Sequence, residues 1–259
     1  MGFSPAWLAL REPVDHASRD AGLLAQAVAC AGQGEGAVVV DLGSGTGSTA
    51  RAFGEAACET CQWRFVDSDR ALLDIAQARH PGAELVVFDL RDIDQLPLEG
   101  VGLVTASALL DLMPLEWVTA LARRLQGAGI PFYGALNFNG VMRWSPRHDA
   151  DAGVTRAFNT HQRTDKGIGP ALGPTASEAA TQVFKQHGFD VHLGDSPWEL
   201  GAAEARLHDE LLAGIGHAAA EVGFAQARDW VADRRAAVAQ TAGYIGHTDI
   251  LALPQKVEE

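Results

Sequence analysis

The chain has 259 residues, a formal net charge of −13 and 47% hydrophobic residues, which is enough apolar material for one α/β domain with an added element. The acidic charge disfavours nucleic acid or an anionic membrane as the main partner, because no local basic cluster offsets it. The chain has no apolar run of about 18 residues and no basic leader followed by an apolar stretch, so we expect a cytoplasmic protein.

The first predicted helix covers residues 14–32, where four apolar residues share one helical face. A buried parallel strand is then predicted over residues 38–42, which are apolar except for Asp41. Glycines follow at positions 43, 45 and 47, and bare backbone there can approach a ligand closely. A dinucleotide-binding fingerprint needs its third glycine at position 48, but the chain has Ser48.

An acid followed by G-x-G-x-G resembles the first motif of the class I methyltransferases that use S-adenosylmethionine. That cofactor carries a sulfonium and an ammonium group but no phosphate, so its pocket tolerates acids. The resemblance implies that the following residues contact the cofactor: Asp41, Gly43, Ser44, Gly45 and Gly47. The alternatives are an NAD-dependent oxidoreductase, which shares the architecture, and a protein that binds adenosylmethionine without catalysis.

A second strand is predicted over residues 63–67, ending at Asp67. A doubly wound sheet holds its ribose-binding carboxylate at this position, so we expect Asp67 and its neighbour Ser68 to bind the cofactor's ribose. A plain turn residue is the alternative for Asp67. For Asp69 we favour a role as the cap of the next helix.

The third strand is predicted over residues 84–88 and leads into Asp89 and Leu90. The resemblance implies that Asp89 accepts the amino hydrogens of adenine and that the Leu90 backbone meets a ring nitrogen. The alternative is that Asp89 only starts a loop.

The fourth strand is predicted over residues 101–106. The resemblance places Ala106 and Ser107 near the methionine arm of the cofactor and Asp111 on the reaction face. No Asn-Pro-Pro-Tyr type of motif follows this strand, where residues 107–110 read Ser-Ala-Leu-Leu, so methylation of nucleic-acid bases is not expected.

Helices alternate with these strands, and a fifth strand is predicted over residues 130–138, a pattern that indicates a parallel sheet. We therefore expect a doubly wound, seven-stranded, mostly parallel sheet with an antiparallel edge strand, in three α/β/α layers. The predicted helices of this part are near residues 47–56, 69–80 and 114–126.

We expect one methyltransferase domain over residues 1–259, with a cofactor-binding core at 14–138 and an insertion at 139–174. The insertion is too long for a simple αβ loop, which suggests a lid that forms the acceptor pocket. His161 is a candidate general base because imidazole titrates near neutral pH, although an ordinary surface histidine, or one that orders the lid through Asp165, is an equal alternative. The candidate substrate-binding residues are Trp144, Asn159, Gln162 and Lys166.

The rest of the chain predicts a helix at 175–187, strands at 189–193 and 247–253, and a helical hairpin inserted at 201–243. The hairpin departs from the minimal pattern of class I methyltransferases. Its apolar stripes fit either the protein core or the seam of a homodimer.

Two further features stand outside these motifs. In related folds an amino-terminal helix closes over the cofactor, so the resemblance implies that Arg19 meets the cofactor carboxylate; a helix pair with Asp15 is the alternative. Cys58 and Cys61 have zinc or redox spacing, but the chain has no second cysteine pair, so we expect no metal.

Together these features predict transfer of a methyl group from S-adenosylmethionine to an oxygen, nitrogen or carbon nucleophile of a small molecule. The protein would contribute alignment, desolvation and one base.

Overall fold

The computed structural model describes residues 3–32, 37–54 and 61–255, so Cys58 lies outside the described residues. The strands are β1 (Val38–Leu42), β2 (Gln62–Asp67), β3 (Glu84–Val87), β4 (Val101–Ser107), β5 (Phe132–Ser145), β6 (Phe189–Asp195), β7 (Trp198–Leu200) and β8 (Ala242–Pro254). The α-helices are α1 (Pro5–Ser18), α2 (Ala21–Ala31), α3 (Ser48–Phe53), α5 (Arg70–Arg79), α6 (Leu115–Ala128), α7 (Asp151–Gln162), α8 (Ala176–Gln186), α9 (Ala205–Glu221) and α10 (Ala227–Ala236). Short 3₁₀ helices cover Leu90–Gln95, Leu110–Leu112, Gly173–Thr175 and Val238–Gln240.

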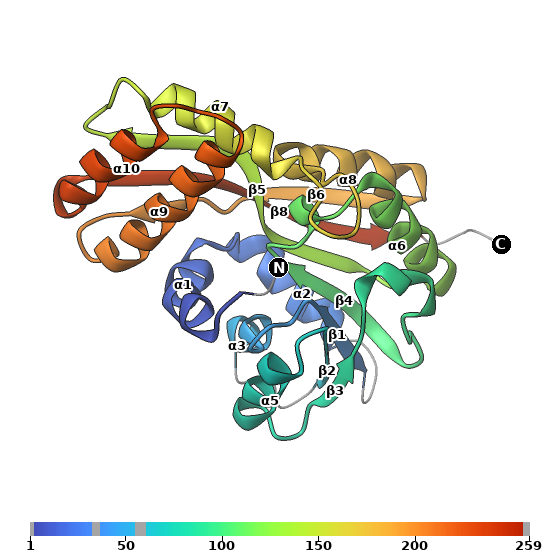
Figure 1. Ribbon diagram of the computed structural model, residues 1–259. Coiled ribbons are helices and arrows are strands. Elements are labelled where there is room, and N and C mark those ends of the chain that lie inside the picture. Colours follow the sequence, from blue (N-terminus) through green and yellow to red (C-terminus); the bar gives the residue numbers. More distant parts are fainter. Residues whose placement is uncertain (1–2, 33–36, 55–60, 256–259) are drawn as a thin grey trace.

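The strands form a single mixed sheet in the order β3-β2-β1-β4-β5-β8-β6, and β7 also pairs with β8 (Figure 1). Strands β1 to β5 are parallel, whereas β8 is antiparallel to both β5 and β6. This confirms the predicted α/β class with a mostly parallel sheet. Two details differ from the prediction. The sheet has an eighth strand, the short β7, and the antiparallel strand lies one position inside the edge because β6 is outermost.

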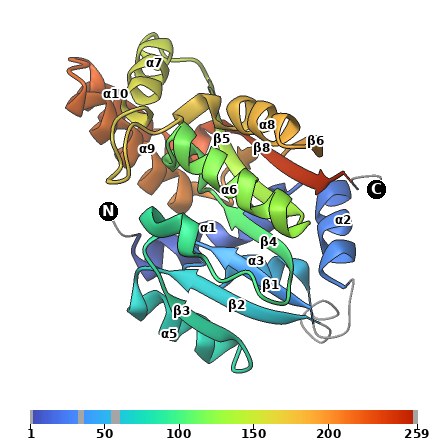
Figure 2. The same ribbon diagram turned by 90° about the vertical axis from the view of Figure 1, so that its right-hand side faces the viewer.

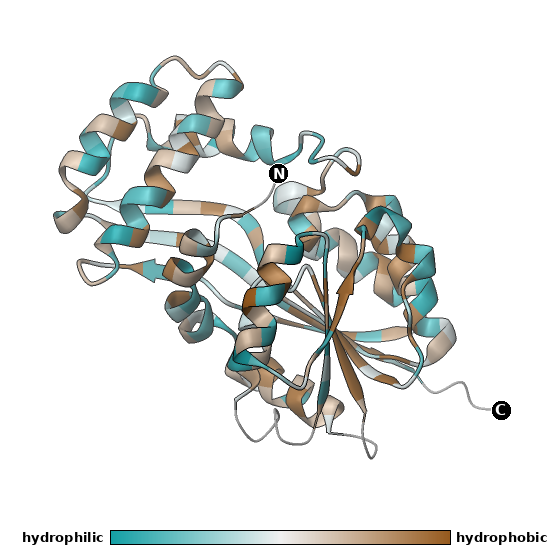
Figure 3. Ribbon diagram, turned by 60° about the horizontal axis from the view of Figure 1, so that its bottom comes forward, coloured by the Kyte–Doolittle hydropathy of each residue, from teal (hydrophilic) through white to brown (hydrophobic). Residues whose placement is uncertain are grey.

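Helices cover both faces of the parallel part of the sheet (Figure 2). Successive residues of a strand point to opposite faces, so Val39 packs with Leu23 of α2 while Val40 packs with Leu121 of α6. In Figure 3 the central strands are mostly hydrophobic and the helices around them carry both kinds of residue, as expected for a sheet buried on both sides.

The N-terminal segment forms two helices where the sequence predicted one. Arg19 has an extended ψ of 142° and ends α1, and the Asp20 side chain then caps α2 by accepting from the Leu23 N–H over 2.8 Å. The periodic apolar pattern runs across this break, which explains the incorrect prediction. The break turns α1 away from α2, and α1 contacts the loop that follows β1.

Strands β5 and β8 are much longer than predicted and extend past the parallel sheet. Residues 139–145, assigned to the insertion, belong to β5, and β8 starts at Ala242. Helices α7, α9 and α10 gather around this extension (Figure 1) and enclose a third hydrophobic core, which buries Trp144, Ile215 and Trp230. The apolar stripes of the hairpin thus pack within the chain itself. None of the described helices is long and apolar enough to cross a membrane.

Candidate active site

The glycine loop after β1 is held in a conformation that only glycine adopts easily. Gly43, Gly45 and Gly47 have φ angles of 62°, 52° and 78°, all in the left-handed region. The loop is fixed by two backbone hydrogen bonds, from Ser44 N–H to the Val66 carbonyl over 3.1 Å and from Gly47 N–H to the Ser44 carbonyl over 2.9 Å. The three glycines therefore have a geometric cause independent of any ligand.

Asp67 at the end of β2 is bound to this loop. Its Oδ2 accepts from the Gly45 N–H over 2.9 Å, and its Oδ1 accepts from the Asp69 N–H, also over 2.9 Å. Each carboxylate oxygen keeps a second lone pair for a further donor. The bond to Asp69 also gives Asp67 the turn role that was the alternative. Asp69 caps α5 through the Ala71 N–H, which confirms its predicted role.

A chain of polar groups connects Asp41 of β1 to Arg19 through Thr49, whose side chain also hydrogen-bonds Asp41. Thr105 of β4 donates to Asp41 Oδ1 over 2.8 Å, Thr49 Oγ1 lies 3.1 Å from Ser107 Oγ, and Arg19 Nη2 donates to Ser107 Oγ over 2.9 Å. Burial raises the pKa of Asp41 to about 6, although the bond from Thr105 and the positive charge of Arg19 offset part of this effect.

The same groups leave several buried atoms unused. Within the described part of the chain, no partner reaches Arg19 Nε and Nη1, Asp41 Oδ2 or Ser44 Oγ. Buried polar atoms are normally hydrogen-bonded, so unused donors and acceptors at one place indicate a ligand. The free N–H groups of Arg19 match a carboxylate and the free oxygen of Asp41 matches an ammonium group, which are the two charges at the amino-acid end of S-adenosylmethionine.

Asp89 and Leu90 sit where the chain leaves β3. Asp89 forms an exposed bidentate ion pair with the Arg91 side chain and accepts from the Arg91 N–H over 2.9 Å. The Arg91 side chain and backbone lower the pKa of Asp89 to about 2. Leu90 is half-buried, and its carbonyl accepts from Trp117 Nε1 over 2.7 Å. An adenine bound at Asp89 would share its carboxylate with Arg91.

Helix α1 lies directly on the glycine loop. Leu8 Cδ1 is 3.2 Å from the point that a Gly45 Cβ would occupy, and His16 Nε2 lies 3.0 Å from Ser48 Oγ. Glu12 binds Arg51 through two contacts of 2.6 and 2.7 Å, and Arg51 Nη1 donates to the Thr46 carbonyl over 2.8 Å.

Sequence reasoning missed this group. Glu12 and Arg51 are 39 residues apart and belong to no recognisable motif. Only the break between α1 and α2, which the periodicity concealed, brings them together.

Asp111 follows β4 in a 3₁₀ turn and is 6% exposed. Its Oδ1 has no hydrogen-bond partner among the described residues. Burial raises the pKa of Asp111 to about 6, partly offset by backbone hydrogen bonds, including one to Phe138, and by the charges of Arg11 and Lys166. A buried carboxyl group with a raised pKa and an unused oxygen has the properties of a general base.

His161 is engaged in the contact between α7 and α9. Its Nε2 lies 2.8 Å from Glu221 Oε2, and its Nδ1 lies 3.3 Å from Lys166 Nζ. Lys166 also donates to the His161 carbonyl over 2.9 Å. These contacts fit the structural alternative, in which His161 orders this segment, although the partners are Glu221 and Lys166.

The other residues predicted to bind substrate do not converge on one place. Trp144 is buried against Trp230, with ring centroids 5.1 Å apart, and Asn159 Nδ2 donates to the Gly140 carbonyl over 3.0 Å. Gln162 is half-buried at the end of α7. A role for Trp144 in substrate binding is therefore not supported by its surroundings.

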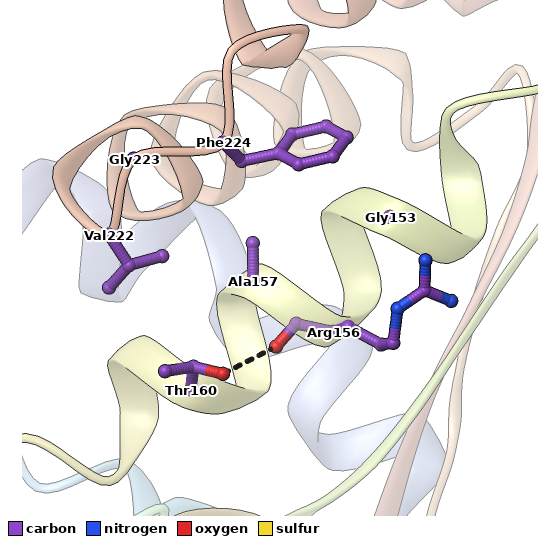
Figure 4. Close-up of a pocket in the computed structure, with 7 residues that line it drawn as sticks. All are labelled: Gly153, Arg156, Ala157, Thr160, Val222, Gly223 and Phe224. Atoms are coloured by element: carbon purple, nitrogen blue, oxygen red, sulfur yellow. Dashed lines mark hydrogen bonds between the residues drawn. The ribbon is translucent and has the colours of Figure 1, made fainter.

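A shallow pocket of about 280 Å³ does lie against α7, at the turn between α9 and α10 (Figure 4). Arg156 and Thr160 come from α7, and the Phe224 ring contacts the backbone of α7 at Gly153. This pocket contains none of the residues of the glycine loop or of the strand ends beside it.

The matched family model is a methyltransferase domain, and it covers residues 39–129, which include the glycine loop, Asp67, Asp89 and Asp111. Residues 39–129 thus form a class I, S-adenosylmethionine-dependent methyltransferase domain. The cofactor of this domain is S-adenosylmethionine, and the unused buried atoms at Arg19 and Asp41 fit that molecule.

Solved structures share the fold of this chain at low sequence identity. The YcgJ protein from Bacillus subtilis is 12% identical with a TM-score of 0.56, over 92% of this chain and 100% of that one. The cyclopropane synthase MmaA2 from Mycobacterium tuberculosis is 12% identical with a TM-score of 0.54, over 96% and 94% of the two chains. Geranyl diphosphate C-methyltransferase from Streptomyces coelicolor A3(2) is 15% identical with a TM-score of 0.50, over 90% and 80%. No curated protein sequence matches the chain.

Proposed function

We propose that this methyltransferase acts on a small molecule and transfers the methyl group to one of its oxygen, nitrogen or carbon atoms. The observation that carries the proposal is the buried carboxyl group of Asp111, whose Oδ1 has no partner in the described chain, close to the end of β4. When bound, the cofactor supplies an activated methyl group on a positively charged sulfur. The chain contributes cofactor binding, exclusion of water and one proton acceptor.

In this proposal the two ends of the cofactor are held by different elements. Asp41 and Arg19 bind the ammonium and carboxylate groups, and Asp67 with Ser68 binds the ribose. Asp89 and Leu90 hold the adenine. The backbone of the glycine loop and of Ala106 and Ser107 lies along the amino-acid arm.

The charge of the molecule supports a small acceptor over a nucleic acid. The net charge is −13, and Arg123 and Arg234, each from a pair of adjacent arginines, form ion pairs with Asp94 and Asp151. Paired arginines offer little attraction to a phosphate backbone. Helix α1 also covers the glycine loop, which suits an acceptor small enough to be enclosed.

The test has two stages. Calorimetry first measures binding of S-adenosylhomocysteine and NAD, and we expect binding of the former only. The purified protein and tritiated S-adenosylmethionine are then incubated with a cell extract, and the label is followed in the metabolite, protein and nucleic-acid fractions. The Arg19→Gln protein replaces the wild type as the inactive control. Label in the metabolite fraction is expected. Label confined to protein or nucleic acid would contradict the proposal.

A further inference from the structure

Two buried polar side chains near the end of β4 have hydrogen-bonding atoms without a partner in the described chain. One is Asp111 with its free Oδ1, and the other is His247 of β8, also 6% exposed, whose Nδ1 has no partner among the described residues. Phe138 of β5 connects them, because its backbone interacts with the Asp111 carboxyl group and its ring contacts the imidazole with centroids 6.2 Å apart. Phe138 and His247 are also direct cross-strand partners.

The imidazole of His247 is held firmly in place. Trp198 of β7 also packs against it with ring centroids 5.1 Å apart, and Trp198 Nε1 donates to Asp15 Oδ1 over 3.0 Å. Burial lowers the pKa of His247 to about 3, and the positive charge of Arg11 adds to this effect. The imidazole is therefore neutral at physiological pH, and it offers a hydrogen-bonding atom without a charge.

Two cations lie beside this pair, and both already have hydrogen-bond partners. Arg11 lies over the Trp198 ring at 5.0 Å, but its Nε and Nη2 bind both oxygens of Asp15 at 2.7 and 3.1 Å. Lys166 donates to the His161 carbonyl and to Thr164. An acceptor that carried a phosphate or carboxylate would place its charge beside the buried carboxyl group of Asp111, and Arg11 is already paired with Asp15, so the surroundings favour an uncharged acceptor.

We propose that Asp111 and His247 together bind the hydroxyl group of an uncharged phenol, with Asp111 as the catalytic base and His247 as a positioning residue. This inference rests on the proposed small-molecule methyltransferase activity and names the acceptor class. The two unused atoms, Asp111 Oδ1 and His247 Nδ1, complete their hydrogen bonding on the acceptor.

The acid strength of the acceptor selects a phenol over an aliphatic alcohol. A phenol has a pKa of about 10, as in tyrosine, whereas an alcohol is close to water at about 16. The pKa of a carboxylate base is therefore much closer to that of a phenol than to that of an alcohol, which favours proton transfer from the phenol. As the phenol oxygen bonds to the methyl carbon, the carbon–sulfur bond breaks with its electron pair left on sulfur. The hydroxyl proton passes to Asp111, and bulk water later accepts it.

The experiment uses the intact protein saturated with S-adenosylhomocysteine, and the probe is phenol, with benzoate as a charged analogue. Ligand-observed NMR gives the dissociation constants, and crystals of the complex soaked in phenol locate the probe. We expect phenol between Asp111 and His247, and at least about tenfold weaker binding of benzoate. Phenol located elsewhere, or benzoate bound as well as phenol, would overturn the inference.

Variants separate positioning from folding. His247→Phe should weaken phenol binding about tenfold and raise KM in the labelled methyl-transfer assay with little change in kcat. His247→Asn, which places a hydrogen-bonding amide at that position, should restore much of the phenol affinity. The matched control is His208→Phe, since His208 is another buried histidine with unpartnered ring nitrogens in the described chain, but it packs against Gly243 in the β5–β8 extension.

The outcomes distinguish the two proposals. If the wild-type protein does not bind S-adenosylhomocysteine, the proposed function itself is contradicted. Retained cofactor binding with equal phenol affinity in wild type, His247→Phe and His208→Phe would overturn only the acceptor inference.

Discussion

The Arg19 guanidinium donates to the Ser107 hydroxyl over 2.9 Å, which joins the break between α1 and α2 to the end of β4. A guanidinium has five N–H donors, and here Nε and Nη1 stay buried without a partner in the described residues. The Arg19 side chain is only 6% exposed, so these donors cannot be satisfied by bulk water. The arrangement is prepared for a bidentate anion such as the cofactor carboxylate.

Replacing Arg19 should therefore weaken cofactor binding strongly. Arg19→Gln removes a charge-assisted bidentate contact, which corresponds to about 1.5–3 kcal/mol or roughly 10- to 150-fold in Kd. Calorimetry with S-adenosylhomocysteine measures the change. Arg70→Gln is a suitable control because Arg70 is exposed and pairs only with Asp74 among the described residues, and it should bind like wild type. Equal affinity of both variants would exclude Arg19 from the site.

Cofactor affinity should fall in mildly acidic solution because of Asp41. Burial raises the pKa of Asp41 to about 6, and only the ionised carboxylate can bind an ammonium group. Between pH 7.5 and pH 5 the affinity should drop about tenfold, since one unit below the pKa leaves about one tenth of the group ionised. Calorimetry at several pH values checks this. Asp41→Asn should bind S-adenosylhomocysteine weakly, and its affinity should not change with pH through ionisation at position 41.

Asp111→Asn provides the control for that profile. Its carboxyl group titrates in the same range but lies on the proposed acceptor side, so the variant should keep the pH dependence of cofactor binding. A flat profile in Asp111→Asn would show that Asp111, and not Asp41, controls the binding.

The sequence signals for the proposed cofactor site are local, so the structure could be expected to bring these residues together. The glycines after β1 and the acid at the end of β2 occupy fixed positions relative to strand ends, and parallel strands bring those ends together at one edge. Alternating strands and helices were likewise enough to predict the parallel sheet.

The acceptor half could not be predicted in the same way. Trp144, Asn159 and His161 were grouped because they share one segment, but β5 continues to Ser145 and carries Trp144 nine residues past Ala135, the partner of Ser107. At roughly 3.3 Å per residue this is up to about 30 Å. His247 was missed because it enters the site only through the pairing of β8 with β5, which depends on contacts remote in sequence.

The ion pair between Glu12 and Arg51 should control how fast the cofactor leaves. Arg51 binds both the Glu12 carboxylate on α1 and the Thr46 carbonyl in the glycine loop, so the pair fastens α1 over that loop. Glu12→Gln should raise the dissociation rate of S-adenosylhomocysteine about three- to tenfold, as expected for loss of roughly 1 kcal/mol from a half-buried pair. Stopped-flow fluorescence gives this rate. An unchanged rate in Glu12→Gln would show that α1 does not need to move for release.

Trp144 should contribute to stability and leave the cofactor site unchanged. It packs edge-on against Trp230, and the guanidinium of Arg234 lies 5.6 Å from the centre of its ring. Trp144→Ala should lower the free energy of unfolding by about 3–5 kcal/mol because it leaves a large cavity in the third core. Urea unfolding measures this loss. An unfolding free energy close to wild type together with a raised KM would instead support the original prediction that Trp144 binds substrate.

Asp111 should lower the free energy of unfolding at neutral pH, where its buried carboxyl group is ionised. Its pKa is close to 3.8 in the unfolded chain and about 6 in the folded protein, so between these pH values the folded state binds more protons. The free energy of unfolding therefore falls as pH rises from about 4 to 6, by at most about 3 kcal/mol from this group. Asp111→Asn has no such loss, and its melting temperature relative to wild type should rise with pH up to neutrality.

Thermal unfolding at pH 4.5 and 7.5 tests this, with Asp94→Asn as a control because Asp94 is 67% exposed in its pair with Arg123. The control should show no such pH-dependent gain, since an exposed pair contributes little to stability. The Asp111→Asn protein should also lose at least about 100-fold in methyl transfer while binding S-adenosylhomocysteine normally, as expected when a general base is removed. A variant that is both less stable than wild type at pH 7.5 and fully active would show that Asp111 is a structural carboxylate, bound by groups that stabilise its charge.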